Sequence, residues 1–163
     1  MSYRALSLVT FFSALGCGLI AGVFFAFSTF VMPALARIPP MQGIAAMQSI
    51  NITVYNRWFM GALMGTAAAC ALLVVTSLLN WSAPGARLQL AASVLYLVGT
   101  IFVTGSYHVP RNNALALVQP ETAAAAESWA RYLAEWVPWN HIRTITSLLA
   151  AVLFTLALLS RGR

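Results

Sequence analysis

The chain has 163 residues, of which 61% are hydrophobic and only 7% are charged, whereas about a quarter of the residues in soluble domains are charged. This composition excludes an ordinary water-soluble domain, since one core of this size could not bury so much apolar surface. Lys and Asp are absent, which excludes Gly-Lys-Ser/Thr phosphate loops, Schiff-base lysine chemistry and EF-hand calcium sites. The net charge of +6 comes from arginines scattered singly around apolar segments, so we expect the lipid bilayer, and not nucleic acid, as a partner.

The first apolar run covers about residues 6–35 and contains no charged residue. It exceeds the ~20 residues that a membrane-spanning helix needs, and it is far longer than the apolar region of a signal peptide. Near its end, Phe27 and Ser28 lie among further phenylalanines ahead of Pro33. These aromatic side chains could line a pocket for a flat apolar molecule, or they could simply pack against neighbouring helices.

A polar connection rich in Gln, Asn and Met follows, from Arg37 to Arg57. Within it, residues 41–55 predict a short amphipathic helix at the membrane surface. Asn51 and Arg57 are among its strongest polar groups. We therefore consider both as candidate substrate-binding residues.

Two further apolar runs, about residues 58–79 and 88–107, are joined by the turn-forming segment 80–85. Spans joined by so short a turn are antiparallel neighbours. The longest polar stretch of the chain comes next, over 108–140, and a helix is expected over 121–136 within it.

This expected helix carries both apolar and charged side chains. Trp129 and Trp136 belong to one apolar stripe that would lie on the bundle or at the membrane interface. Glu127, Arg131 and Glu135 follow at i, i+4 and i+8, which is typical of a surface charge ladder.

The fourth span is expected over about residues 141–160. The chain is thus predicted to be a single all-α domain, an integral membrane four-helix up-down bundle with two longer polar connections at one face and both termini at the other. The positive-inside rule favours cytoplasmic termini in a bacterial inner membrane. Assembly into a homo-oligomer is left open.

The two histidines of the chain fall at the face that carries the long connections. His108 ends the third span and His141 begins the fourth, so an up-down bundle brings them to the same side of the membrane, with Asn112, Asn140 and Arg143 nearby. The imidazoles could form hydrogen bonds only, act as a general base with its partner, or ligate a metal ion or a haem iron. Arg143, about one turn inside the fourth span, is costly there unless it snorkels or finds a partner, such as a glutamate or an anionic ligand.

Three segments resemble one family of small membrane proteins. They are GVFFAFSTFVMPAL from Gly22, HVPRNNAL from His108, and WARY from Trp129 together with WNHIRT from Trp139. This set is similar to the anthrone oxygenase-like family of four-helix membrane proteins, many of whose bacterial members have no known function. The resemblance extends over nearly the whole chain.

The resemblance implies oxidation of an aromatic anthrone to an anthraquinone by molecular oxygen, without a required cofactor. Such chemistry needs a base, for which His108 or His141 is available, and donors that stabilise an enolate, for which Asn112, Asn140 or Arg143 is available. Trp139 and the phenylalanines of the first span would then form a flat apolar platform. A quinol or another lipophilic aromatic would fit the same pocket.

Two other functions are compatible with the same residues. His108 and His141 could be ligands of haem or a metal ion, or the protein could be a non-catalytic membrane binding or transport subunit. A transport role has little support, because no charged residue lies in the middle of a span.

Overall fold

The computed structural model describes residues 2–161, and within that range the secondary structure is entirely helical. The elements in chain order are α1 (Tyr3–Ala26), the π-helical segment η1 (Phe27–Val31), α2 (Met32–Leu35), α3 (Pro40–Thr53), α4 (Arg57–Leu79), α5 (Ala86–Tyr96), the π-helical segments η2 (Leu97–Phe102) and η3 (Thr104–His108), α6 (Val109–Ala116) and α7 (Ala125–Arg161).

Four continuous helical stretches are long and apolar enough to cross a membrane, namely Tyr3–Leu35, Arg57–Leu79, Ala86–Ala116 and Ala125–Arg161. In the most apolar 18-residue part of each stretch, only 28% to 39% of the residues are buried inside the bundle. Large apolar side chains such as Leu19, Val98 and Leu148 therefore face outward, where water would be unfavourable and lipid is the suitable solvent. The prediction of an all-α bundle with four spans is confirmed.

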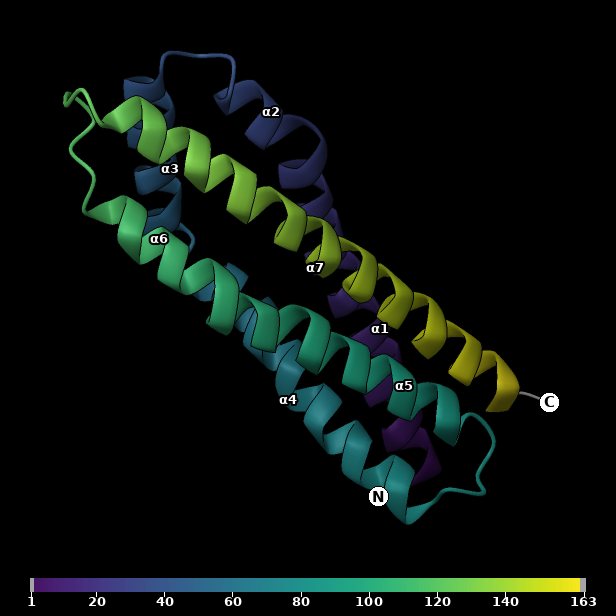
Figure 1. Cartoon of the computed structure of the whole chain (residues 1–163). Coiled ribbons are helices and arrows are strands. Elements are labelled where there is room, and N and C mark those ends of the chain that lie inside the picture. Colours follow the sequence, from purple (N-terminus) through teal and green to yellow (C-terminus); the bar gives the residue numbers. More distant parts are fainter. Residues whose placement is uncertain (1, 162–163) are drawn as a thin grey trace.

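The four stretches run up and down beside one another (Figure 1). Both ends of the described chain lie at one end of the bundle. Helix α3 and the connection between α6 and α7 lie at the other end, as expected for the two longer connections. The polar end and the terminal end are thus separated by the length of the spans.

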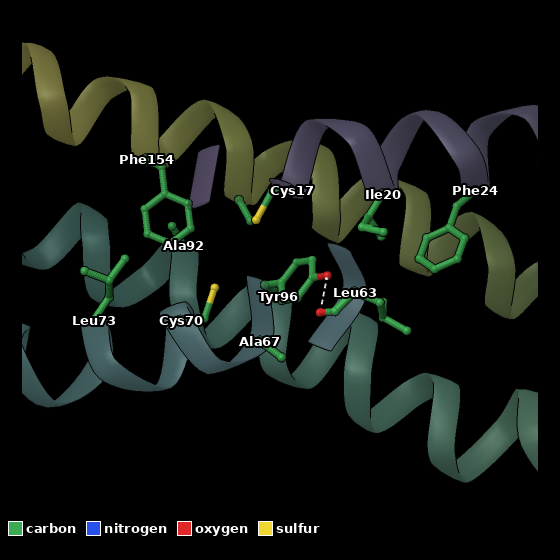
Figure 2. Packing of buried hydrophobic residues seen from close by; sticks show 11 residues of the cluster. Cys17, Ile20, Phe24, Leu63, Ala67, Cys70, Leu73, Ala92, Tyr96 and Phe154 are labelled. Carbon is green, nitrogen blue, oxygen red and sulfur yellow. Dashed lines mark hydrogen bonds between the residues drawn. The ribbon is translucent and has the colours of Figure 1, made fainter. Parts of the chain in front are cut away.

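The main core lies in the middle of the bundle, where α1, α4, α5 and α7 meet. Figure 2 shows Cys17 and Ile20 of α1 pointing toward Cys70 of α4 and Tyr96 of α5. The Tyr96 hydroxyl donates a hydrogen bond to the backbone carbonyl of Leu63, over 3.1 Å. This bond satisfies the phenol in an otherwise apolar interior.

A second, aromatic core joins α3 to the ends of α6 and α7. Gln48 of α3 donates to the carbonyls of Leu115 and Val118, both over 2.9 Å. Trp129 stacks on Tyr132, with ring centroids 5.6 Å apart and planes at 12°. The tryptophan stripe of the sequence therefore packs inside the molecule, against α3.

Helix α7 is longer than the expected fourth span. Residues 125–136 of the expected helix and the span over 141–160 belong to one helix of 37 residues that continues through Pro138, whereas residues 121–124 form a turn before it. Proline removes one backbone donor, but membrane helices tolerate this loss where neighbouring groups compensate. The third span is also extended, through η3 and α6 to Ala116, so most of the stretch 108–140 is helical.

The turn between α4 and α5 depends on Gly85, which has a φ of 77°. A Cβ atom at this position would lie 2.6 Å from the carbonyl oxygen of Ala157. Only glycine allows both the left-handed backbone and the close approach of α7.

Candidate functional site

A cavity of about 260 Å³ lies at the polar end of the bundle. Pockets for drug-sized ligands measure roughly 300–1,000 Å³, so this one suits a small molecule. Its apolar lining is Val23, Phe24, Phe27, Met47, Ile50, Val54, Phe59, Met60, Leu63, Met64, Ile101, Gly105, Val109 and Trp136, and its polar lining is Asn51, Tyr55, Thr104, His108, Asn112 and Arg143. Among residues 2–161, no carboxylate belongs to this lining.

Three of the polar groups come from one face of the third span. Thr104, His108 and Asn112 are spaced i, i+4 and i+8, and η3 and α6 are continuous. The amide of Val109 bonds to the carbonyl of Thr104, five residues back, which is the π-helical pattern. The π-helical segment η1 supplies Phe27 on the opposite wall.

His108 is only 1% exposed. Neither Nδ1 nor Nε2 has a hydrogen-bond partner within the described chain. The ring lies edge-on to Trp136, with centroids 4.8 Å apart and planes at 84°. Buried polar atoms are rarely left unpaired, so both imidazole nitrogens lack a partner that a bound ligand or a water molecule would supply.

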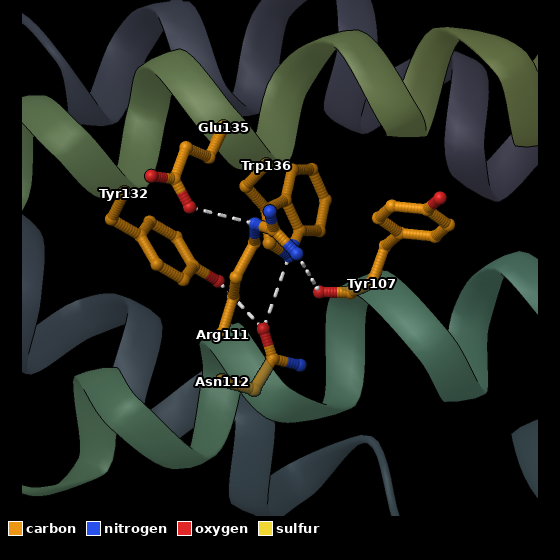
Figure 3. Close-up of polar contacts among 6 residues, drawn as sticks. All are labelled: Tyr107, Arg111, Asn112, Tyr132, Glu135 and Trp136. Carbon is orange, nitrogen blue, oxygen red and sulfur yellow. Dashed lines mark hydrogen bonds and ion pairs between the residues drawn. The ribbon is translucent and has the colours of Figure 1, made fainter.

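Asn112 is held in one orientation by two donors from α7 (Figure 3). Its Oδ1 accepts from the Tyr132 hydroxyl over 2.8 Å and from Trp136 Nε1 over 3.1 Å. Since an indole nitrogen can only donate, the atom facing it must be the amide oxygen. The amino group of Asn112 therefore points away from this pair, and it has no acceptor among residues 2–161.

Arg143 is buried at the cavity wall, with 5% of its surface exposed. It donates from Nη1 to Thr104 Oγ1 over 3.1 Å and from Nη2 to Asn140 Oδ1 over 2.7 Å. Its guanidinium carbon lies 4.0 Å from the centre of the Phe24 ring. Neither ion pair recorded for residues 2–161 involves Arg143, so this charge is stabilised only by neutral groups and by aromatic faces.

Asn140 and Ser28 support Arg143 and lie outside the cavity lining. Asn140 Nδ2 donates to the carbonyl of Phe24 and to Ser28 Oγ, both over 2.8 Å. This ties α7 to the end of α1 and orients Asn140 Oδ1 toward the guanidinium.

Two glutamates of this end form ion pairs with arginines. Glu127 pairs with Arg131 over 2.8 Å. Glu135 does not continue that ladder, because it pairs with Arg111 of α6 over 3.0 Å (Figure 3). The acidic groups of this end thus stay outside the cavity.

The structure brings together some of the residues singled out in the sequence and leaves others apart. His108, Asn112, Arg143, Asn51 and Phe27 line the cavity. Asn140 and Ser28 lie behind the lining and support Arg143, whereas His141, Arg57 and Trp139 lie elsewhere.

These three residues have surroundings of their own. His141 is exposed on α7. Arg57 is exposed beside Trp58, with its guanidinium carbon 4.8 Å from the ring. Trp139 stacks on Tyr107, with centroids 3.6 Å apart, so it clamps α7 to η3.

The residues that the sequence analysis missed are Thr104, Trp136 and Tyr132. Thr104 is recognisable in hindsight, because it lies one turn before His108 on the face that leads to Asn112. Trp136 belongs to an apolar stripe, and the spacing of that stripe does not indicate that the indole nitrogen orients an amide.

A metal centre held by the two histidines does not fit this arrangement. No group of three or more His, Cys, Asp or Glu side chains converges anywhere in residues 2–161. His108 lines the cavity and His141 does not, so the cavity offers one imidazole without a second protein ligand of these types.

Comparison with protein families gives one match. The model of the anthrone oxygenase family matches residues 52–153, which is more than half of the chain and includes α4, the third span and most of α7. Comparison with the curated proteins and with the solved structures gives no significant match. The match contains Thr104, His108, Asn112 and Arg143, while α1 and η1 lie before it. The chain belongs to the anthrone oxygenase family.

Proposed function

We propose that the protein oxidises a flat lipophilic aromatic, of the anthrone type, with molecular oxygen inside the cavity. The observation that carries the proposal is that His108 and Arg143 line the same cavity. Within the described chain, neither imidazole nitrogen has a hydrogen-bond partner, and the buried guanidinium has no carboxylate partner. Such a site favours a ligand that gives up a proton and becomes an anion.

His108 is the proposed base. An anthrone carries an acidic CH₂ group opposite its carbonyl, and removal of one proton gives an enolate. Arg143 and the free amino group of Asn112 are the proposed donors to the enolate oxygen, and Asn51 offers a further buried amide nitrogen without a partner in residues 2–161. These donors act in apolar surroundings, where they are stronger than in water.

The overall reaction balances without a further reductant. Both C–H bonds of the CH₂ group break, and the carbon loses four electrons to dioxygen. One oxygen atom forms the new carbonyl of the anthraquinone, and the other leaves as water with the two protons. A quinol would instead lose two electrons and two protons to dioxygen, which gives a quinone and hydrogen peroxide, with the same base and the same donors.

The setting of this reaction is proposed to be a bacterial inner membrane, with the termini in the cytoplasm. This orientation rests on the arginines that flank the terminal end of the bundle. Lipid and a lipophilic small molecule are the proposed partners, and self-association remains compatible with the exposed faces.

The proposal is tested with the purified protein in lipid nanodiscs and with anthrone as the substrate. Oxygen uptake and the absorbance of anthraquinone report turnover. Replacement of His108 by Gln is expected to lower kcat about a hundredfold or more, since a positioned general base contributes about 10²–10⁴.

The matched control is His141→Gln, which changes the other histidine at an exposed position of α7. It is expected to keep the activity of the original protein. Equal activity of the protein and of both variants would overturn the proposal, and so would tight anthrone binding without any oxidation, which favours a binding subunit.

A further inference from the structure

The cavity reaches the surface of the protein at three of its lining residues. Tyr55 is 65% exposed, Met64 is 50% exposed, and Gly105 is also exposed. The rest of the lining is buried or half-buried. Tyr55 precedes α4, Met64 lies on α4 and Gly105 lies on η3, so the opening is between α4 and the third span.

Two of these three residues, Met64 and Gly105, lie at the depth of the lipid chains, whereas Tyr55 precedes the start of α4. Arg57 and Trp58 are both exposed at the start of α4, and such residues mark the membrane interface. Met64 lies six residues farther along the helix, about 9 Å deeper at 1.5 Å per residue. The exposed thioether and the exposed glycine therefore border the apolar layer and not the aqueous phase.

The two segments that border the opening, α4 and η3, are only loosely packed together. Helix α4 packs along α5 and η2, but much less on η3. A Cβ atom built on Gly105 would meet nothing within 4 Å. Because Gly105 also lines the cavity, we expect a larger side chain at this position to narrow the opening.

We propose that the gap between Met64 and Gly105 is a lateral portal through which a lipophilic aromatic passes from the bilayer into the cavity. The identity of this ligand class rests on the proposed function. A ligand that partitions into lipid reaches His108 and Arg143 by this route without crossing water. Gly105 and Met64 then determine the rate of access and leave the affinity to the groups farther inside.

The test separates access from affinity. The protein is placed in phosphatidylcholine nanodiscs, and binding of anthraquinone, which cannot be oxidised further, is followed by stopped-flow quenching of tryptophan fluorescence, since Trp136 lines the cavity. Gly105→Leu is expected to slow association and dissociation alike, by about tenfold. The equilibrium Kd should stay the same, because the side chain obstructs the route and does not contact the donors.

Two further variants guard against a failure of folding or packing. Met64→Trp obstructs the gap from the opposite side and should also slow binding. Gly105→Leu combined with Met64→Ala should restore a rate near that of the original protein, because the smaller side chain makes room for the leucine.

The control is Gly61→Leu. Gly61 is an exposed glycine of α4 whose added Cβ would likewise meet nothing within 4 Å, but it does not line the cavity. It is expected to leave both rate constants unchanged.

Association that is equally fast in the protein, in Gly105→Leu and in Met64→Trp would overturn the portal, as would a raised Kd with unchanged association. Slow binding in both variants would support it even if the His108 experiment finds no oxidation, because anthraquinone binding needs no turnover. A protein that binds neither anthrone nor anthraquinone would contradict both proposals.

Discussion

Arg143 is a charged residue placed where charge is costly. Its guanidinium is buried between Phe24 and Trp136, and within the described part of the chain its hydrogen bonds go to Asn140 and Thr104. An anionic ligand would supply the counter-charge that no carboxylate among residues 2–161 provides, so ligand binding would lower the electrostatic cost of burying the guanidinium. Stability and function therefore depend on this residue in different ways.

The Arg143→Met variant tests this separation. Methionine keeps much of the apolar volume and removes the buried charge, so we expect the thermal unfolding midpoint to change by no more than a few degrees. Anthrone oxidation should fall about a hundredfold or more, as for the loss of a donor to a developing oxyanion. Unfolding followed by tryptophan fluorescence and turnover followed by oxygen uptake give the two values.

A conservative variant provides the control for charge. Arg143→Lys keeps the cation but cannot reach Asn140 and Thr104 in the same forked geometry, so partial activity is expected. A large loss of stability in Arg143→Met with proportionate loss of activity would instead identify Arg143 as a structural group.

At the scale of elements, α3 forms the wall of the cavity that lies outside the four spans. It supplies Met47, Ile50 and Asn51 to the lining. Its position depends on close packing at Gly43, where a Cβ atom would lie 2.9 Å from the Trp129 ring and 3.1 Å from the carbonyl oxygen of Leu35. The ring has little freedom to move, because it is stacked on Tyr132.

Gly43→Ala is therefore expected to destabilise the protein by about 1–3 kcal/mol, as overpacking usually does. It should also weaken anthraquinone binding, because α3 must shift to relieve the contact. Thermal unfolding and equilibrium fluorescence titration measure the two effects. The matched change Gly18→Ala adds a methyl group in open space on α1 and should be neutral or slightly stabilising; equal behaviour of the two variants would contradict the role given to Gly43.

The elements themselves were largely predictable from the sequence. Uninterrupted apolar runs determine four spans, because backbone polar groups in lipid must be satisfied within a helix. The N-terminal part of α7, before Pro138, could not be predicted as part of the fourth span, since a proline normally indicates a helix boundary. This part of the helix packs against α3 and α6, and no local sequence pattern predicts such packing.

The candidate site was predictable only in part, for a similar reason. The spacing of His108 and Asn112 places them on one face, but whether Arg143 snorkels or turns inward depends on the rotation of α7 in the bundle. The same rotation leaves His141 exposed, although it is adjacent to the buried Asn140. Tertiary packing thus determines which side chains of a helix face the cavity, and the spacing of polar residues alone does not predict it.

At the scale of the whole molecule, the two ends of the bundle have separate tasks. The terminal end is joined by Gln89, which is buried on α5. Its Oε1 lies 3.0 Å from Thr10 Oγ1 and also accepts from Arg161, while its Nε2 donates to Ser77 Oγ over 2.8 Å. One side chain thereby links α1, α4, α5 and α7, far from the cavity.

Gln89→Leu should accordingly affect stability alone. Hydrogen bonds between membrane helices contribute about 0.6–1.7 kcal/mol each, so the thermal midpoint should fall by several degrees. The Kd for anthraquinone should stay unchanged, because Gln89 and His108 are separated by 19 residues of one continuous span, or about 29 Å. The control for the loss of an amide is Gln42→Leu, at an exposed position of α3. A changed Kd in Gln89→Leu would contradict the separation and show that the two ends are coupled.

The gap between Met64 and Gly105 also determines how an affinity of this protein has to be expressed. With an opening at the depth of the acyl chains, the site samples the ligand dissolved in lipid, whatever its level in the buffer. Additional lipid at constant total ligand dilutes the ligand within the bilayer. This dilution lowers the occupancy of the cavity, although the ligand concentration in the aqueous phase has hardly changed. Affinities obtained at different lipid-to-protein ratios are therefore comparable only as mole fractions of ligand in the bilayer.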